Sequence, residues 1–227
     1  MEGPYNKVRL NFGQKILMIS MELKKYSTIG PICAHWQLKV NGQQNLRQNR
    51  KNKNFVYLIS PNKIEGESFY INLDLVLRSR KVSFFQLRLK KETNQNKLTI
   101  GKKIKKICRK YKVKFLINDD PLLAKKLNAD GCHLGQKDMS IIKARKILKN
   151  KIIGVTCHNS INLAKSAIRA GADYLAFGAF YSSKTKIVKY KANLTTLTSV
   201  KKITSLPIVA IGGIKLNNYK KLLLNKA

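Results

Sequence analysis

The sequence predicts an α/β protein of the (βα)8-barrel type, with parallel strands as the inner wall and helices as the outer layer. Three observations support this class. From residue 55 onward, short β-rich segments alternate with longer segments of helical periodicity, and each unit has about the size of one βα repeat. Several short segments are apolar almost throughout, as expected for parallel strands covered on both faces. Polar residues follow these segments, where barrels carry their functional groups.

Seven strand–helix units follow one another along the chain. The expected strands are residues 55–60, 82–89, 113–118, 131–134, 152–156, 174–177 and 207–211. The expected helices include residues 98–110, 121–127, 140–148, 161–170 and 194–203, and a last helical pattern covers 216–224. A doubly wound open sheet is the alternative architecture, and it would also place ligands at the carboxyl ends of the strands.

Local signals mark the ends of several helices. Ser140 precedes apolar residues at helical spacing, so its hydroxyl can cap that helix. Pro121 stands at a first-turn position, where a missing backbone N–H is tolerated. Gly171 follows Ala170 as a stop signal before the strand at 174–177.

The seven units leave the barrel one strand short, because no strand follows the helical pattern at 216–224. We expect the barrel to be truncated before its eighth strand, or to close in an unusual way. Residues 1–54 fit no unit and are rich in Asn, Gln and Lys. We therefore expect two regions: a basic, mostly disordered extension at 1–54 with a short helix around 14–25, and an incomplete barrel at 55–227.

The formal net charge of +35 comes from 46 basic and 11 acidic residues, a balance typical of nucleic-acid-binding proteins. The lysines are, however, spread over every helix and loop, and no aromatic residues interleave with them as a stacking platform. We interpret the charge as a surface that attracts small anionic substrates, with no specific nucleic acid as partner. The apolar segment at 16–23 is too short to cross a membrane. The four cysteines form no metal-binding or CxxC pattern, which indicates a reduced, cytoplasmic location.

An anion clamp is predicted at the end of the strand that begins at residue 82. Gln86, Arg88 and Lys90 alternate with Leu87 and Leu89, so the three polar side chains share one face. A guanidinium fork beside an ammonium group is suited to a polyphosphate. The alternative is an edge strand with one solvated face.

Two aspartates that follow neighbouring strands could share a cation. Asp119 and Asp138 are the natural pair, because Mg²⁺ takes one or two protein carboxylates together with substrate phosphates. Helix capping is the alternative role for each of them. Near the next strand end, Cys157 is expected to be a buried thiol, and His158 either a structural contact or a proton-transfer group. His133 is expected to be packed or hydrogen-bonded within its strand.

Two later segments are suited to phosphate groups. Residues 178–186 form a loop rich in hydroxyl groups and lysines, which could grip a phosphate or could simply be solvated. Gly212 and Gly213 follow the last expected strand, where backbone N–H groups can approach an anion closely.

Taken in order, these motifs resemble the thiamine-phosphate synthase family, a family of TIM barrels. The matching segments are residues 86–90, 116–119, 129–138, 153–156, 171–174 and 208–214, and the resemblance covers about residues 55–226. It implies an enzyme of thiamine biosynthesis that joins hydroxymethylpyrimidine diphosphate to a thiazole phosphate. The products would be thiamine phosphate and pyrophosphate, and the cofactor would be Mg²⁺.

The resemblance also implies roles for individual residues. Asp119 and Asp138 would hold Mg²⁺, Thr156 would lie beside the pyrimidine and the leaving group, and Gly213 would contact the thiazole phosphate. The pyrimidine diphosphate would be held by Gln86, Arg88, Lys90 and Asn118. The loop that binds thiazole phosphate and pyrophosphate would contribute Ser183, Thr185 and Lys186, with Thr156 and Lys186 as the catalytic residues.

Three features depart from the family pattern. Leu89 replaces the usual acidic residue, Asp120 replaces the usual basic residue, and the eighth strand with its serine-containing phosphate contact is missing beyond Ala227. We therefore expect weakened binding of the thiazole phosphate. Two alternatives remain: a thiazole tautomerase of the same fold, with His158 as its proton-transfer group, and a truncated, non-catalytic phosphate- or nucleic-acid-binding module. The predicted clamp favours the synthase, because an isomerase has no diphosphate to neutralise.

Overall fold

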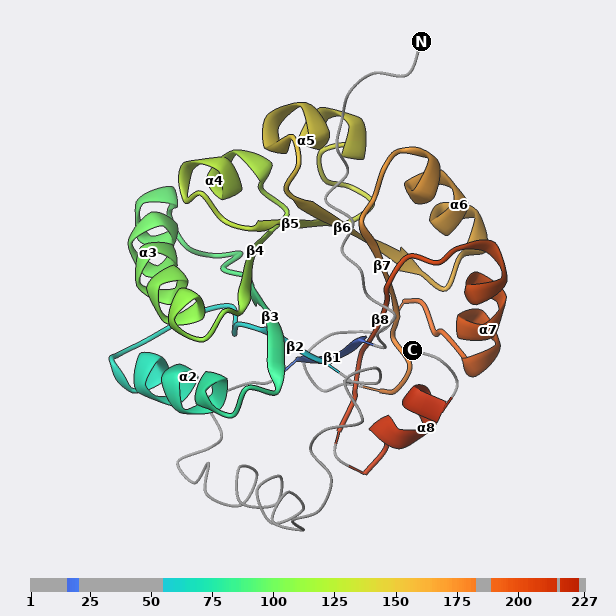
Figure 1. Cartoon of the computed structure of the whole chain (residues 1–227), viewed down its shortest axis with the longest axis horizontal. Helices are drawn as coiled ribbons and strands as arrows, with labels where there is room; N and C mark the ends of the chain where they lie inside the picture. The colour runs from blue at the N-terminus through green and yellow to red at the C-terminus, as the bar shows by residue number, and fades with distance from the viewer. Residues whose placement is uncertain (1–15, 21–54, 183–188, 216, 225–227) are drawn as a thin grey trace, which may run out of the picture.

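Eight parallel strands close into a barrel, and the helices form a ring outside it (Figure 1). This computed structural model describes residues 16–20, 55–182, 189–215 and 217–224. The strands pair in chain order: β1 Ile16–Ser20, β2 Phe55–Ile59, β3 Val82–Leu87, β4 Lys114–Asn118, β5 Gly131–Leu134, β6 Ile152–His158, β7 Tyr174–Gly178 and β8 Ile208–Ile211. The barrel class predicted from the sequence is confirmed, and β2 to β8 correspond to the seven predicted strands.

The helices of the described residues alternate with these strands. They are α2 Ser68–Arg78, α3 Asn94–Lys110, α4 Pro121–Lys126, α5 Ile141–Leu148, α6 Ile161–Arg169, α7 Leu194–Ile203 and α8 Tyr219–Leu224. The predicted caps are present: Ser140 Oγ accepts a hydrogen bond from the backbone N–H of Lys143, and Pro121 occupies the first turn of α4. None of these helices has the length and apolar character needed to cross a bilayer.

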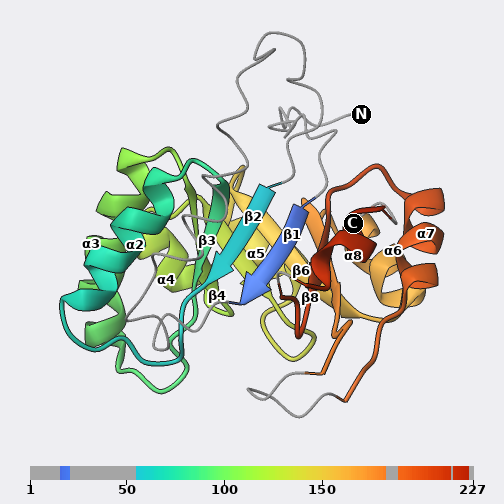
Figure 2. The same cartoon turned by 90° about the horizontal axis from the view of Figure 1, so that it is seen from below.

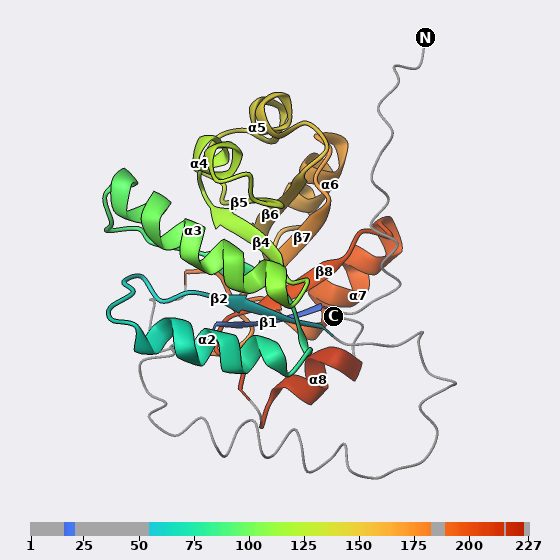
Figure 3. The same cartoon turned by 60° about the vertical axis from the view of Figure 1, so that its left-hand side comes forward.

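Strand β1 closes the barrel and comes from the region that was predicted to be an extension. It runs parallel to β2 (Figure 2) and pairs with it from Ile16–Phe55 to Ser20–Ile59, and it also pairs with β8 at Ile16–Val209 and Leu17–Ala210. Helix α8 packs against β1 on the outside (Figure 3). The place of the missing eighth strand is thus taken by residues 16–20.

The helix predicted around residues 14–25 is therefore wrong over Ile16–Ser20. In a short segment that is apolar throughout, the sequence periodicity cannot distinguish a strand from a buried helix. Its conformation is decided by its neighbours, because the edges of β2 and β8 carry backbone N–H and C=O groups that form hydrogen bonds with an added strand. The rest of residues 1–54 lies outside the described part of the chain.

The core has two layers, because successive side chains of each strand point alternately inward and outward. The outer layer lies between the strands and the helices. It is the larger of the two and includes Leu73, Phe85 and Phe177. The inner layer fills the barrel and consists of Tyr57, Ile59, Phe84, Leu116, Ile152, Tyr174, Ala176 and Val209. Two of these inner residues carry hydroxyl groups, which become important for the site.

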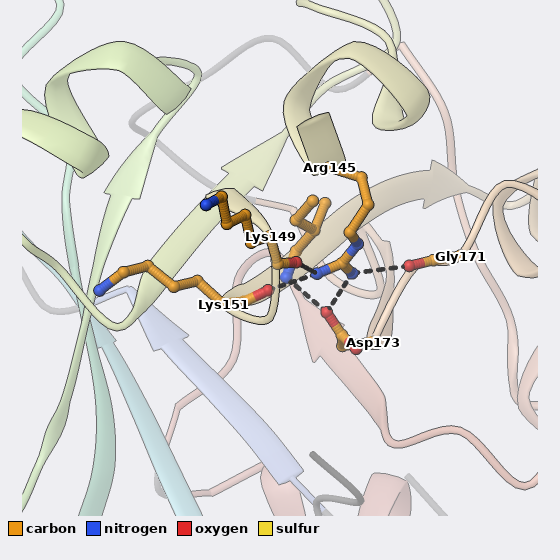
Figure 4. Close-up of polar contacts among 6 residues, drawn as sticks. Arg145, Lys149, Lys151, Gly171 and Asp173 are labelled. Carbon is orange, nitrogen blue, oxygen red and sulfur yellow. Dashed lines mark hydrogen bonds and ion pairs between the residues drawn. The ribbon is translucent and has the colours of Figure 1, made fainter. Parts of the chain in front are cut away.

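An arginine at the amino ends of the strands joins two loops, the one before β6 and the one before β7 (Figure 4). The guanidinium group of Arg145, in α5, donates hydrogen bonds of 2.6 to 2.8 Å to the carbonyl oxygens of Lys149, Lys151 and Gly171 and to the carboxylate of Asp173. The same Asp173 oxygen accepts the backbone N–H of Ile153 at 2.7 Å. These contacts join the starts of β6 and β7. They lie at the amino-terminal end of the barrel, where residues usually contribute to stability and not to catalysis.

Replacing Arg145 should lower the stability of the fold. We expect Arg145→Ala to reduce the free energy of unfolding by roughly 2–3 kcal/mol, because several half-buried oxygen atoms lose a charged donor. Arg145→Lys should recover only part of this loss, since one ammonium group cannot reproduce the planar fork. Urea denaturation followed by circular dichroism measures both values. Arg109→Ala, at an exposed position of α3, is the control, and an equal effect of the two alanine variants would contradict the proposed role.

Candidate functional site

The carboxyl ends of the parallel strands meet at one rim of the barrel, and polar side chains gather there. Arg88 follows β3, Asn118 ends β4 and is followed by Asp119, and Thr156 lies in β6. Asp138 stands in the loop after β5. The closed topology therefore brings together residues as far apart in the sequence as Arg88 and Thr156, which are 68 positions apart (156 − 88).

Gln86, Arg88 and Lys90 point to one side of their strand, but they reach different depths. Gln86 is only 2% exposed and lies inside the barrel. Arg88 is fixed at its backbone, whose N–H donates to Ser60 Oγ at 2.8 Å, and its guanidinium group donates to Asn62 Oδ1. The ammonium group of Lys90 lies 3.1 Å from Asp119 Oδ2. Two cations thus face the rim, while the amide of Gln86 belongs to an interior network.

Asp119 and Asp138 lie close enough to influence each other. Burial raises the pKa of Asp138, and the adjacent carboxyl group of Asp119 raises this pKa further. The backbone N–H of Gly135 donates to Asp138 Oδ2 at 2.6 Å and holds the carboxyl group in place. Asp119 has a left-handed backbone with φ of 64°, and its N–H donates to the carbonyl oxygen of His133 at 2.8 Å.

Helix capping does not occupy these two aspartates. Asp120 caps α4, because its Oδ1 accepts the backbone N–H of Leu123 at 2.9 Å, and Ser140 caps α5. The carboxyl groups of Asp119 and Asp138 therefore remain at the rim. Asp120 thus has a structural role at a position where the family that the sequence resembles has a basic residue. Leu89, which replaces the usual acidic residue of that family, is buried in the outer layer of the core.

The pair of carboxyl groups fits a hard divalent cation that is shared with a ligand. Two carboxyl groups in contact repel each other when both are ionised, and a cation between them removes that repulsion. The described residues contain no group of three or more His, Cys, Asp or Glu side chains that could hold a metal ion. Such a two-carboxylate arrangement suits Mg²⁺, which usually keeps water and substrate phosphates as its remaining ligands.

A chain of hydrogen bonds crosses the barrel interior below the rim. It runs from Thr156 Oγ1 to His133 Nε2 (2.8 Å), from His133 Nδ1 to the Tyr174 hydroxyl (2.7 Å), and from there to the Tyr57 hydroxyl (2.8 Å). The Tyr57 hydroxyl donates to Gln86 Oε1 at 3.2 Å, and Gln86 Nε2 donates to Asn118 Oδ1 at 2.5 Å. Six strands each contribute one residue. We call these six side chains the interior relay.

His133 is neutral at the centre of this relay. Its burial lowers its pKa to about 4. The ring stacks on Tyr174 with 5.6 Å between the ring centres. The prediction of a hydrogen-bonded strand histidine is confirmed for His133. Tyr57 and Tyr174 were not predicted from the sequence, because an inward-facing tyrosine on an apolar strand resembles any other core aromatic residue.

A cavity of about 240 Å³ opens beside the rim between β3 and β4. Its lining is partly apolar and partly charged, with Leu87, Leu89, Lys90, Lys97, Asn118, Asp119, Asp120 and Leu123. Lys97 adds a cation from the first turns of α3. No pattern in the sequence singles out Lys97, because it is one of many lysines at helical positions.

The segment after β8 makes a tight turn against the segment after β7. Gly212 and Gly213 have φ values of 98° and 62°, and a Cβ atom at Gly213 would lie 2.4 Å from the carbonyl oxygen of Ser182. Asn218 holds the turn, since its Nδ2 donates to the carbonyl oxygen of Gly213 at 3.0 Å. The turn therefore requires glycine at 213. Ser183, Thr185 and Lys186 lie outside the described residues.

The remaining polar candidates near β6 have structural contacts. Cys157 is fully buried, and burial raises the pKa of its thiol to about 12, which confirms the expectation of a buried thiol. The ring of His158 stacks on Tyr190, with 4.3 Å between ring centres and 26° between ring planes.

Comparisons with known proteins show which family the chain belongs to. A family model described as thiamine monophosphate synthase matches residues 56–227. A thiamine-phosphate synthase of Pelagibacter ubique (strain HTCC1062) is 82% identical over 182 residues, which cover 80% of this chain and 88% of that protein. A thiamine-phosphate synthase of Nitrosomonas eutropha is 40% identical over 74% of this chain and 79% of that protein. The solved structure of thiamine phosphate pyrophosphorylase from Pyrococcus furiosus superposes with a TM-score of 0.66, at 29% identity over 75% of this chain and 81% of that one.

Proposed function

Because this chain belongs to the thiamine monophosphate synthase family, we propose that it joins hydroxymethylpyrimidine diphosphate to a thiazole phosphate. The products are thiamine phosphate and pyrophosphate. The observation that supports this reaction best is the adjacent carboxyl pair of Asp119 and Asp138, with the cations of Arg88 and Lys90 at the same rim. A diphosphate leaving group needs such a combination, because charge accumulates on it as its bond to carbon breaks.

In this proposal Arg88 and Lys90 bind the diphosphate oxygens, with Gln86 and Asn118 beside them. Arg88 binds as a fork and Lys90 as a point charge. Asp119 and Asp138 hold Mg²⁺, which, when bound, neutralises charge on the departing pyrophosphate. The ion pair between Lys90 and Asp119 would be exchanged for contacts to the metal and the substrate.

The second substrate would be held on the opposite side of the rim. Gly213 would contact the thiazole phosphate, since its turn carries no side chain that blocks the backbone N–H groups. Thr156 would lie beside the pyrimidine and the leaving group. We assign the loop contacts to Ser183, Thr185 and Lys186 from the family match alone, with Lys186 as a catalytic cation. The buried, unpaired thiols of Cys108, Cys132 and Cys157 suit a reduced compartment, so we place the reaction in the cytoplasm.

A product assay tests this function. The purified chain, given both substrates and Mg²⁺, should release thiamine phosphate and pyrophosphate in equal amounts, because each coupling expels one diphosphate. Chromatography of the thiamine phosphate and an enzymatic pyrophosphate assay measure the two products. Omission of either substrate is the control. Isomerisation of a thiazole without pyrophosphate release would instead support the tautomerase alternative, and tight, strongly salt-dependent duplex binding without turnover would support a nucleic-acid-binding module.

A further inference from the structure

The interior relay has a direction, which follows from counting hydrogens. The Tyr57 hydroxyl donates its only hydrogen to Gln86, so its oxygen accepts from Tyr174. The Tyr174 hydrogen is thereby used as well, so its oxygen accepts from Nδ1–H of His133. A neutral imidazole carries one N–H, and its other nitrogen is an acceptor. Nε2 of His133 therefore accepts the hydroxyl hydrogen of Thr156.

The two ends of the relay consequently differ in what they can offer a ligand. The hydrogen of the Thr156 hydroxyl points inward to His133, so toward the rim this oxygen presents lone pairs. At the other end, the oxygen of Asn118 is engaged by Gln86, so what its amide can present is N–H. One end is thus an acceptor and the other a donor.

We propose that Tyr57 and Tyr174 are positioning residues, which fix Thr156 as an acceptor for a hydrogen-bond donor of the pyrimidine and Asn118 as a donor to the diphosphate. This inference rests on the proposed function and extends it to two residues that do not reach the rim. The lone pairs of Thr156 would face a donor group of the pyrimidine, and the N–H groups of Asn118 would face the phosphate oxygens, which are acceptors. A relay of this direction therefore suits both ends of one substrate. A reversed relay would offer each end the wrong partner.

The packing around the tyrosines supports a positioning role. Tyr57 and Tyr174 are 1% and 3% exposed, so their hydroxyl groups are removed from water and need partners. Phenylalanine would fill the same space without that requirement. Gly154 makes room for Tyr174, because a Cβ atom there would lie 1.8 Å from Cζ of the tyrosine ring. Tyr57 is held by stacking on Phe84 at 5.4 Å between ring centres.

The direction can be measured without any substrate. Long-range ¹H–¹⁵N spectra of the protein near neutral pH distinguish histidine tautomers, and the His133→Gln variant assigns the signal. We expect the proton of His133 on Nδ1 in the wild type. In Tyr174→Phe the Nδ1 position loses its acceptor, so the proton should move to Nε2 and donate to Thr156. A wild-type proton on Nε2, or an unchanged tautomer in Tyr174→Phe, would overturn the relay whatever the activity.

The consequence for binding is measured by steady-state kinetics. Tyr174→Phe should raise KM for the pyrimidine diphosphate about ten-fold. In this variant Nε2–H of His133 donates to Thr156, so the hydroxyl hydrogen of Thr156 turns toward the rim. It then faces a donor of the substrate, and the hydrogen bond between Thr156 and the pyrimidine is lost. KM for the thiazole phosphate should stay within about two-fold, since a structural defect alone would affect both substrates. Tyr57→Phe removes the donor that fixes Gln86 Oε1 and so loosens the orientation of Asn118, and it should weaken inhibition by inorganic pyrophosphate. Tyr111→Phe is the control, because this hydroxyl binds Asp74 between α2 and α3, outside the relay.

The outcomes separate the two proposals. The expected tautomer change with an equal KM for the pyrimidine diphosphate in wild type and Tyr174→Phe would overturn the positioning role. The expected tautomer in a wild-type protein that forms no thiamine phosphate would overturn the proposed function, while it would support the direction of the relay.

Discussion

Asp119→Asn should reduce Mg²⁺-dependent formation of thiamine phosphate by at least about 100-fold, because the amide cannot supply the negative charge that a hard cation requires. The substitution should leave the fold intact. Asp119 has a left-handed backbone, which asparagine also adopts readily, and asparagine has nearly the same size and shape. Asparagine is thus a better test than alanine, which would add backbone strain to the loss of charge.

Turnover as a function of Mg²⁺ concentration measures this effect. If Asp119 is a ligand, the variant should require far more Mg²⁺, and thermal unfolding should remain near that of the wild type. Asp74→Asn is the matched control: it removes a carboxylate that pairs with Arg78 within α2 and with Lys110 of α3. Full activity of Asp119→Asn at ordinary Mg²⁺ would show that the carboxyl pair does not hold the cation.

Arg88→Ala should weaken binding of the pyrimidine diphosphate by about ten- to a hundred-fold and leave binding of the thiazole phosphate nearly unchanged. A charge-assisted hydrogen bond typically contributes roughly 1.5–3 kcal/mol, which corresponds to this range. Arg88→Lys should also be impaired, because a single ammonium group cannot form the planar, two-point contact. Asn62, which accepts a hydrogen bond from the guanidinium group, would have to release or share it when the substrate binds.

Calorimetric titration of each variant with each substrate measures the selectivity. Arg169→Ala removes an exposed arginine at the end of α6 and controls for the general loss of positive charge. Equal weakening for both substrates, or for neither, would remove Arg88 from the diphosphate site. A selective loss for the pyrimidine diphosphate would also exclude the tautomerase, which binds no such substrate.

The sequence alone determined the barrel class and most of the rim. Strand–helix alternation is a local pattern, since each strand and each helix has its own periodicity within a few residues. Once the strands are parallel, their carboxyl ends must meet, so Arg88, Asn118, Asp119 and Thr156 could be assigned to one rim before any contact was known. Helix caps such as Ser140 were also predictable, because a cap acts within three residues.

Only the tertiary structure decided which distant groups meet. The closing strand Ile16–Ser20 depends on edges supplied by β2 and β8, and its own sequence is equally compatible with a buried helix. Gln86 shares a face with Arg88 and Lys90, yet it lies within β3 and is buried in the barrel, whereas the two cations follow the end of the strand. The interior relay joins residues separated by 41 positions at His133–Tyr174 and by 117 at Tyr57–Tyr174. A hydroxyl group on an inward-facing aromatic residue acquires its role only when barrel closure brings its partner to hydrogen-bonding distance, and no periodicity within a single strand encodes that partner.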